Sequence, residues 1–445
     1  MSDLDFARAQ MGLSLAFHII FATGGIGMPV VMAISEALYL RTGRAIYLDL
    51  TKRWAKGTAI LFAVGAVSGT VLSFELGLLW PGFMEHAGAI IGMPFSLEGF
   101  AFFTEAIFLG LFLYGWKRMR PAWHWLCGVM VALSGILSGI FVVTANAWMN
   151  APRGFTRAAD GTFTDIDPIA AMLNPASLHQ TLHMTLAAFV ATGFLVAGIH
   201  AYFLLRHPQS EFHRLAFKLG LGLACVSTPL QLLSGDLAAR RVAELQPVKL
   251  AAMEAHYETR SYAPFVIGGW PSSDEQVVRG AIEIPSALSL LVGHSPETVV
   301  PGLDQVPREE WPNVALVHAS FDVMVGCGVL MLLLTAWSAW VWWRGRPFPQ
   351  QRRLLQALVL ATPLGFIAIE AGWFVTELGR QPWVIYGVMR TRDAVTPMPG
   401  LVVPFVTFTL VYLVLSVILV FLLKRQFLET APGSPVPRSI DVGNC

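Results

Sequence analysis

The sequence is poor in charged residues, and this shortage indicates the class of protein. Asp, Glu, Lys and Arg make up 13% of the 445 residues, while hydrophobic residues make up 55%. The charged share is about half of what is usual in soluble domains. The net charge of +1 gives no basic surface for nucleic acid. This composition predicts a helical membrane protein that crosses the bilayer several times.

Cysteine is also scarce, and its spacing excludes two kinds of site. Three of the four cysteines lie in apolar runs and the fourth ends the chain (Cys127, Cys225, Cys327 and Cys445). No CxxCH motif occurs, which excludes a covalent c-type haem, and no cluster has zinc-finger spacing. The first ten residues, MSDLDFARAQ, are acidic where a signal peptide would be basic, so we expect no cleavable signal.

Nine apolar runs are long enough to cross a bilayer and predict nine transmembrane helices. They lie at 11–40, 55–79, 94–116, 122–148, 178–205, 216–235, 313–343, 354–378 and 401–423. The expected fold is all-α and polytopic, with one large loop outside the membrane. We divide the chain into six helices at 1–235, a loop at 236–312, three helices at 313–423 and a tail at 424–445.

The positions of Lys and Arg predict the orientation. The link at 41–56 carries five of these residues, whereas the link at 80–93 carries none. Short links rich in Lys and Arg lie on the cytoplasmic side of membrane proteins. We therefore expect the N-terminus and the loop at 236–312 outside, and the C-terminus inside. Within that loop, a short helix is expected at 247–259.

Several residues inside the predicted spans are unusual for an apolar environment. They are His18, Glu98, Glu105, His183, Asp322, Met324 and Glu370. A charge such as that of Glu370, within IEAGWFVTELGRQPW (369–383), costs roughly 2.5–3.5 kcal/mol at the middle of a span. An ordinary helix end explains the last part of that stretch but not Glu370. We place His18, Glu98, His183 and Glu370 within about two turns of the outer end of their predicted spans, which predicts a cofactor layer there.

The types of these residues suit iron and proton transfer. Neutral imidazole and thioether both bind iron, although Met in a membrane helix more often only packs. His179 and His183, at i and i+4, leave a small metal site open as another interpretation. Glu98 and Glu105 share a helix face and suit a proton relay. A proton-coupled transporter would also hold buried Glu and His, but no internal repeat favours it.

Long stretches of the sequence resemble subunit I of the cytochrome bd-type quinol oxidases. They are AFHIIF around His18, LEGFAFF around Glu98, ANAWMN (145–150), HMTLAAFVATG from His183, Gly235 with Asp236, VKLAAMEA, FDVMVGCG around Met324, and IEAGWF with GRQPW. The resemblance covers nearly the whole chain. The compact loop at 236–312 is similar to the short-loop branch, which includes the cyanide-insensitive oxidases.

The resemblance implies three haems without covalent links, namely two haem b groups and one haem d. His183 and Met324 would be the axial ligands of a low-spin haem b. Glu370 would bind the iron of a high-spin haem b, and His18 the iron of haem d. The family is known to exchange the positions of these last two haems, so their assignment to His18 and Glu370 stays open.

Further roles follow from the same resemblance. Glu98 would lie at the oxygen-reducing haem, as a further candidate ligand of the haem d iron, and Glu105 would lie near it on the proton route. Both are implied to be catalytic. Lys249 and Glu254 would serve the quinol.

Arg380 and Gln381 are implied to support a haem site, and Arg is well suited to bind propionates. Three residues depart from the pattern of the family. Asp322 stands where Arg is usual, Phe366 stands where Trp is usual, and Glu75 belongs to SFELG in place of EFQFG. None of these changes removes an implied ligand.

The activity implied is that of a quinol:O2 oxidoreductase in a bacterial inner membrane. Quinol would be oxidised at the outer face and O2 reduced to water with cytoplasmic protons, which generates a proton-motive force without pumping. The implied partners are subunit II of the oxidase, a small single-span subunit, membrane lipid, quinol and O2. A family member with only b haems, or with another electron acceptor, remains the alternative.

Overall fold

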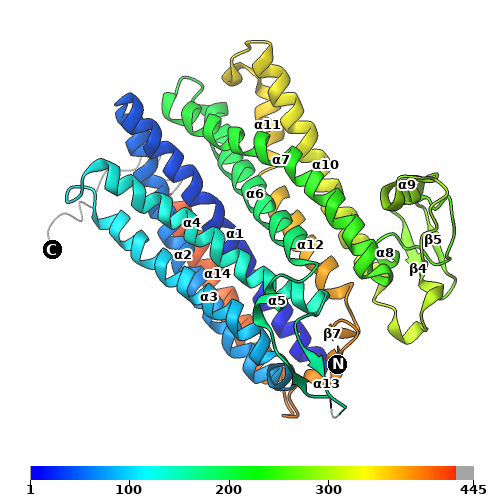
Figure 1. Cartoon of the computed structure of the whole chain (residues 1–445). Coiled ribbons are helices and arrows are strands. Elements are labelled where there is room, and N and C mark those ends of the chain that lie inside the picture. Colours follow the sequence, from blue (N-terminus) through cyan, green and yellow to red (C-terminus); the bar gives the residue numbers. More distant parts are fainter. Residues whose placement is uncertain (1, 160, 427–445) are drawn as a thin grey trace.

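Long helices dominate the computed structural model, which describes residues 2–159 and 161–426 (Figure 1). Nine helical segments in this part of the chain are long and apolar enough to cross a membrane. They are α1 (Asp3–Thr42), α2 (Ala45–Leu79), α3 (Pro81–Tyr114), α4 (Pro121–Asn150), α6 (Ser177–Arg206), α7 (Glu211–Leu245), α10 (Val314–Trp343), α11 (Arg352–Leu360) with α12 (Leu364–Leu378), and α14 (Val402–Lys424). The predicted nine-helix membrane fold is confirmed. Of the predicted tail at 424–445, residues 427–445 lie outside the described part.

Several helices extend beyond the apolar runs that predicted them. The first helix begins at Asp3, because the Ser2 side chain accepts a hydrogen bond from Asp5 N–H and the Asp5 carboxylate accepts one from Ser2 N–H. Helix α3 begins at Pro81, a residue favoured in the first turn, so the predicted link at 80–93 is mostly helical. Helix α7 likewise continues to Leu245, past the predicted end at residue 235.

One predicted span is interrupted. The run at 354–378 forms two helices, α11 and α12, separated by Ala361, Thr362 and Pro363. Proline lacks the N–H that an α-helix interior requires, so the helix stops before it. The Thr362 hydroxyl donates to the Val359 carbonyl at 2.7 Å and satisfies part of the broken end.

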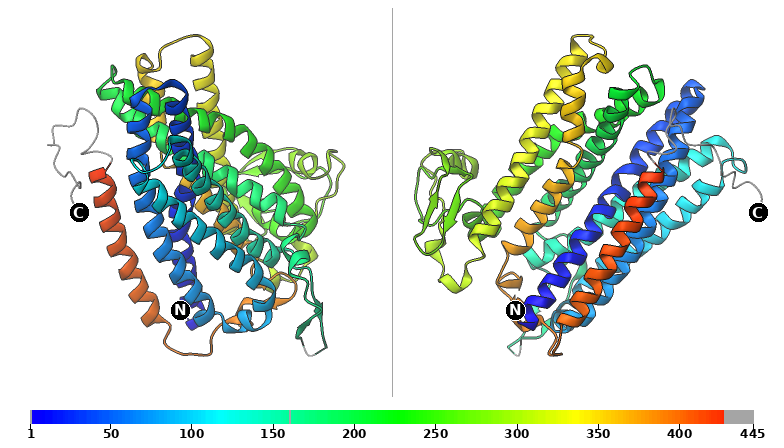
Figure 2. Two further views of the ribbon diagram at one scale, coloured as in Figure 1. Left: turned by 60° about the vertical axis from the view of Figure 1, so that its left-hand side comes forward. Right: turned by 180° about the vertical axis from the view of Figure 1, so that it is seen from behind.

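The helices pack as a bundle in which helices adjacent in sequence form antiparallel pairs, notably α1 with α2, α3 with α4, and α6 with α7. Figure 2 shows α14 running along the outside of α1. Helices α1 and α6 are the most enclosed of the nine, and α12 packs against both α6 and α10. The contact of α12 with α6 is close because Gly365 has no side chain: a Cβ there would lie 2.4 Å from Ala191 Cα.

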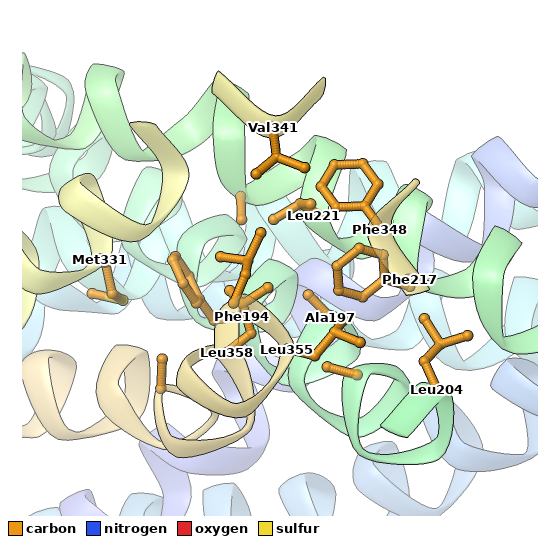
Figure 3. Packing of buried hydrophobic residues seen from close by; sticks show 14 of the residues in the cluster. Phe194, Ala197, Leu204, Phe217, Leu221, Met331, Val341, Phe348, Leu355 and Leu358 are labelled. Atoms are coloured by element: carbon orange, nitrogen blue, oxygen red, sulfur yellow. The ribbon is translucent and has the colours of Figure 1, made fainter. Parts of the chain in front are cut away.

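A large apolar cluster joins α6, α7, α10 and α11 (Figure 3). Its members include Phe194, Ala197, Leu204, Phe217, Leu221, Met331, Val341, Phe348, Leu355 and Leu358. This cluster lies toward the end of the bundle where α6 and α10 finish. The unusual polar residues lie elsewhere, so the molecule separates its main apolar core from its candidate site.

The long connections gather at the opposite end of the bundle, where α1 also begins (Figure 2). They contain β1 (Thr156–Arg157), β2 (Phe163–Thr164), α5 (Pro168–Met172), α8 (Pro247–Met253), β3 (Phe265–Ile267), β4 (Trp270–Ser272), β5 (Val277–Arg279), β6 (Ile282–Ile284), α9 (Ala287–Gly293), η1 (Leu303–Gln305), η2 (Arg308–Glu310), β7 (Trp383–Ile385), β8 (Met389–Arg390) and α13 (Thr391–Ala394). The short η3 (Phe348–Gln350) lies at the other end.

The largest connection, residues 246–313, folds as a small lobe beside α10 (Figure 1). In it β3 pairs with β6 and β4 pairs with β5, both antiparallel. Its first helix, α8, ends at Met253 and is shorter than the predicted helix at 247–259. The chain turns there because Ala255 adopts a positive φ of 46°, which an α-helix cannot continue.

Candidate functional site

His18 projects from α1 toward α2. Its Nδ1 lies 2.9 Å from Ser68 Oγ. The Ser68 hydroxyl proton is directed to the carbonyls of Val64 and Gly65, at 2.9 and 3.1 Å. The serine oxygen can therefore only accept from the ring, which places the ring proton on Nδ1 and the lone pair on Nε2. This is the arrangement that a metal-binding histidine requires.

His183 is held in the same way at the interface of α6 and α7. Its Nδ1 lies 2.9 Å from Ser234 Oγ, and that hydroxyl donates to the Gln231 carbonyl at 2.8 Å. The Gln231 side-chain nitrogen lies 3.1 Å from His183 Nε2. The second candidate histidine is thus also oriented as a neutral ring with its lone pair on Nε2.

Met324 faces the same helix that carries Glu370. A Cβ placed on Gly372 of α12 would lie 3.0 Å from Met324 Sδ, so the glycine leaves room for the sulfur. Glu370 Oε1 is buried and has no hydrogen-bond partner among the described residues. A buried carboxylate oxygen without a partner is unfavourable, which indicates that a ligand satisfies it.

His18 and Glu370 each adjoin in sequence a member of the same apolar cluster. Ile19, the neighbour of His18, packs in it with Ile369, the neighbour of Glu370, and Phe366 lies at its edge. These side chains come from helices that are far apart in sequence. The structure thereby brings two of the predicted haem ligands to neighbouring positions in the bundle.

Glu98 and Glu105 both face α4 from α3. Ser138 Oγ donates to Glu98 Oε1 at 3.1 Å. A Cβ on Gly135 would lie 3.4 Å from both carboxylate oxygens of Glu105, so this acid packs against the α4 backbone. Glu98 and His18 lie several turns into α3 and α1, because both helices begin before the apolar runs that predicted them.

A buried polar network connects the large loop, α4 and the end of α12. Lys249 Nζ donates to Asn150 Oδ1 at 2.6 Å, and Asn150 Nδ2 donates to Asn146 Oδ1 at 3.0 Å. Asn146 Nδ2 donates to Glu377 Oε1 at 2.5 Å. Arg380 Nη2 donates to Glu377 Oε2, also at 2.5 Å. Sequence reasoning gave Asn146 and Asn150 no role, although two amides at i and i+4 in an apolar helix were a usable signal.

This network contains two basic side chains, Lys249 and Arg380, but only one carboxylate, Glu377. Burial, and then the neighbouring Arg380 guanidinium, lower the pKa of Lys249 well below its usual value, while Glu377 opposes the shift. Arg380 is 2% exposed, and its Nε and Nη1 have no partner among the described residues. Because a guanidinium cannot lose its proton, these buried donors require an anionic or polar acceptor.

Gln381 takes a different position from its neighbour Arg380. Its Oε1 accepts from Thr391 Oγ1 at 2.8 Å, and its Nε2 lies 3.5 Å from the Glu377 carbonyl. The side chain thus ties the end of α12 to the following turn. A haem-supporting role for Gln381 remains a prediction.

Glu254 lies at the end of α8 and is fully buried. Its Oε2 accepts weakly from Val266 N–H at 3.5 Å, and its Oε1 has no partner in the described part of the chain. Burial, and to a smaller extent the nearby Asp322, raise the pKa of Glu254 to about 8 against the opposing effect of the Val266 hydrogen bond. A carboxyl with this pKa can both take up and release a proton near neutral pH.

Asp322 and the fully buried His318 connect α10 to the loop. Asp322 Oδ2 accepts from Gly268 N–H at 2.9 Å and lies 3.3 Å from His318 Nε2. His318 Nδ1 lies 2.7 Å from the Met253 carbonyl. Sequence reasoning missed His318, although a histidine one turn before Asp322 in an apolar helix was visible.

The alternative of a small metal site at His179 and His183 gains no support. No three His, Cys, Asp or Glu side chains in the described residues gather as a metal site would require. His179 instead lines a cavity of about 10 Å³ with Asn150, Arg241 and Gln246. A cavity of that size holds at most one water molecule.

The fold and the site together define a polytopic helical membrane protein that holds histidines, carboxylates and a methionine inside its helical bundle. A family model for the cytochrome bd terminal oxidase subunit I matches residues 6–431, and the chain belongs to this family.

The chain is similar to named relatives over almost its whole length. It is 39% identical to a putative cytochrome bd menaquinol oxidase subunit I of Bacillus subtilis, covering 96% of this chain and 97% of the relative. It is 32% identical to the cytochrome bd-II ubiquinol oxidase subunit 1 of Escherichia coli, covering 88% and 89%. The solved bd oxidase of Geobacillus thermodenitrificans superposes with a TM-score of 0.91 at 38% identity, covering 97% of this chain and 99% of that one.

Proposed function

We propose that this chain is the haem-bearing subunit of a terminal quinol oxidase and, with its partner subunit, oxidises quinol and reduces O2 to water. Two quinols and one O2 give two quinones and two water molecules. The observation that carries the proposal is that both candidate histidines have Nδ1 engaged by a serine oxygen that can only accept. Each ring therefore has its lone pair on Nε2, the nitrogen that iron binds, and at His183 the iron would replace the Gln231 amide nitrogen that lies 3.1 Å from this atom.

The residues present fit three haems. His183 and Met324 would hold a low-spin haem b, since Gly372 leaves space at the Met324 sulfur. Glu370, with its unpartnered oxygen, and His18 would hold the two high-spin groups, a haem b and a haem d in that order or exchanged. When bound, the haems supply electron transfer and the site of O2 reduction. The unpartnered donors of Arg380 fit a propionate carboxylate.

Quinol oxidation is assigned to the loop residues Lys249 and Glu254. A quinol releases two protons with its two electrons, so its site needs a proton acceptor. Glu254, with a pKa of about 8, suits this role. Lys249 has a lowered pKa and is fixed by Asn150, so it can bind a quinol oxygen by hydrogen bonding without requiring a buried charge.

Glu98 and Glu105 are assigned to proton delivery for O2 reduction. Both acids lie on the α3 face that meets α4, where the Ser138 hydroxyl already donates to Glu98. Buried carboxylates that alternate between protonated and ionised forms are the usual proton carriers inside membranes. Each can take up a proton, hold it in the apolar interior and release it toward the site of O2 reduction.

The charges and the fold support one position of the chain in the membrane. The N-terminus and the loop of residues 246–313 are proposed to face the periplasm, and α14 ends on the cytoplasmic side of a bacterial inner membrane. The proposed parts are six membrane helices within residues 1–235, the quinol loop at 236–312, three membrane helices within 313–423 and the tail at 424–445. Subunit II and a small single-span subunit are the proposed partners, and the exposed apolar faces of α2 and α14 suit lipid or such partners.

The test is an optical and chemical analysis of the purified oxidase complex. We expect low-spin b and haem d bands in the reduced-minus-oxidised spectrum, together with extractable haem and quinol-driven O2 consumption. Spectra with b bands alone would support the b-only alternative. A colourless, haem-free complex would overturn the proposal and favour a transporter.

A further inference from the structure

Each of the two candidate ligand histidines faces a Ser–Gly dipeptide on the helix that follows its own. His18 of α1 faces Ser68 and Gly69 of α2, and His183 of α6 faces a serine and glycine of α7, Ser234 and Gly235. Each pair belongs to one helical hairpin, and the histidine precedes its serine by 50 residues in one hairpin and 51 in the other. The same local arrangement thus occurs twice in the bundle.

The serine of each pair determines which ring nitrogen carries the proton. Ser68 donates to the carbonyls of Val64 and Gly65 on its own helix, and Ser234 donates to that of Gln231. A hydroxyl has only one proton, so each oxygen must accept from the histidine. Both serines are buried, at 0% and 3% exposure, so water does not compete for the ring nitrogen.

The glycine of each pair lies beside the histidine ring. A Cβ on Gly69 would lie 3.0 Å from His18 Cε1, which is tighter than ordinary packing allows. A Cβ on Gly235 would lie 3.5 Å from His183 Cε1, an ordinary van der Waals distance. A side chain at position 69 would therefore displace the His18 ring by a few tenths of an ångström, whereas one at position 235 would leave the His183 ring in place.

We propose that Ser68, Gly69 and Ser234 are positioning residues: the two serines fix the tautomer of His18 and His183 for iron binding, and Gly69 also sets the position of the His18 ring. This inference rests on the proposed haem function. The serine oxygen holds the Nδ1 proton and so directs the Nε2 lone pair toward the metal. A hydrogen bond from the ring also makes the imidazole a better electron donor, which stabilises the ferric state.

The serine test uses S68A and S234A in the complete oxidase complex. The Gln231 amide lies 3.3 Å from His183 Nδ1. This amide nitrogen is a donor, but rotation of the amide would bring the unpartnered Gln231 Oε1 to the ring as an acceptor, so S234A is also made with Q231L. We expect the low-spin midpoint potential to rise in S234A with Q231L, and the iron–histidine stretching frequency to fall in S68A. Replacement by threonine, which keeps the hydroxyl, should restore part of both values.

Two matched serines serve as controls. Ser227 of α7 donates to the Leu223 carbonyl, and Ser73 of α2 donates to the Gly69 carbonyl. S227A and S73A remove the same hydroxyl without touching a histidine. The positioning role would be overturned if two results matched these controls. One is the midpoint potential of S234A, with or without Q231L, and the other is the iron–histidine stretching frequency of S68A.

The glycine test depends on the unequal distances. We expect G69A to lose the haem bound through His18, because the added methyl meets the ring, whereas G235A keeps its low-spin band. Equal retention in both variants would contradict the inference for Gly69. If G69A fails to assemble, S68A still decides the case for His18.

Failure of this inference can be separated from failure of the proposed function. If H183A loses the low-spin band while S234A with Q231L matches its control, only the positioning role is wrong. If H183A keeps the low-spin band, the ligand assignment itself is wrong.

Discussion

Asp322 Oδ2 accepts a hydrogen bond from the backbone N–H of Gly268 at 2.9 Å, which attaches α10 to the turn between β3 and β4. The same carboxylate lies 3.3 Å from His318 Nε2. Asp322, which stands where the resemblance leads us to expect Arg, therefore contacts the quinol loop. It can act on the loop as well as on the potential of a haem bound through Met324, two residues further along α10.

Asp322 variants separate these two effects. D322N keeps an oxygen that accepts from Gly268 but removes the charge, so it should raise the low-spin midpoint potential by tens of millivolts and leave quinol turnover largely intact. At about 8 Å and an effective dielectric near 20, one charge is worth roughly 2 kcal/mol before screening. D322A also removes the hydrogen bond and should lower quinol turnover several-fold. Redox titration and quinol kinetics measure the two effects, and equal behaviour of both variants would exclude the loop role.

The axial pair of the low-spin haem is tested by M324L and H183A. Leucine fills a volume similar to methionine but offers no sulfur, so M324L should lower the midpoint potential or convert the haem to high spin. H183A should abolish the low-spin band. Met331 lies on the same helix, α10, but packs in the large apolar cluster, which makes M331L the matched control. An unchanged band in both M324L and H183A would refute the pair.

The pH dependence of quinol oxidation tests Glu254. With a pKa of about 8, this carboxyl is roughly one-tenth ionised at pH 7. Only the ionised form can accept a proton, so the quinol-driven rate should rise as pH increases toward 8. E254Q should be slow and lack this rise, while artificial donors still reduce O2 at the normal rate. Equal loss with both kinds of donor would mean that Glu254 is structural.

The buried network is tested at Asn150. N150L removes the acceptor of Lys249 and should cost about 1–3 kcal/mol of stability, because a buried donor is left unpaired. It should also raise KM for quinol more than it lowers kcat. Thermal unfolding of the complex and quinol kinetics measure both effects. T144V on the same helix, which removes a hydroxyl bonded to the Phe141 carbonyl, is the control and should alter KM little.

Hydropathy predicted the spans well but not their ends or their interruption. Long apolar runs are a direct consequence of burying a helix in lipid, so all nine were visible. The starts at Asp3 and Pro81 depend on capping and on polar helical turns, which carry no hydropathy signal. The two- and three-residue strands of the loop are too short to show any periodicity.

The candidate ligands were visible because isolated polar residues are conspicuous in apolar runs, but their partners were not. Ser68 and Ser234 lie about 50 residues from the histidines they contact, and serine is common in membrane helices. The contact of Asp322 with Gly268 likewise depends on how the loop folds. Such pairings require the tertiary structure.

The last prediction concerns the unpartnered donors of Arg380. Glu377 occupies only Nη2, whereas Nε and Nη1 are buried without a partner in the described part of the chain. If a haem propionate satisfies them, R380Q should release haem from the complex, and R380K should retain only part of it, because lysine keeps the charge but not the planar pair of donors. Arg390 of β8 pairs with the half-buried Glu310 of η2 in the large loop, so R390Q is the matched control. The measurement is haem content per complex after purification. Full haem content in R380Q would show that Arg380 does not bind a propionate and that its buried donors serve another acceptor, such as bound water.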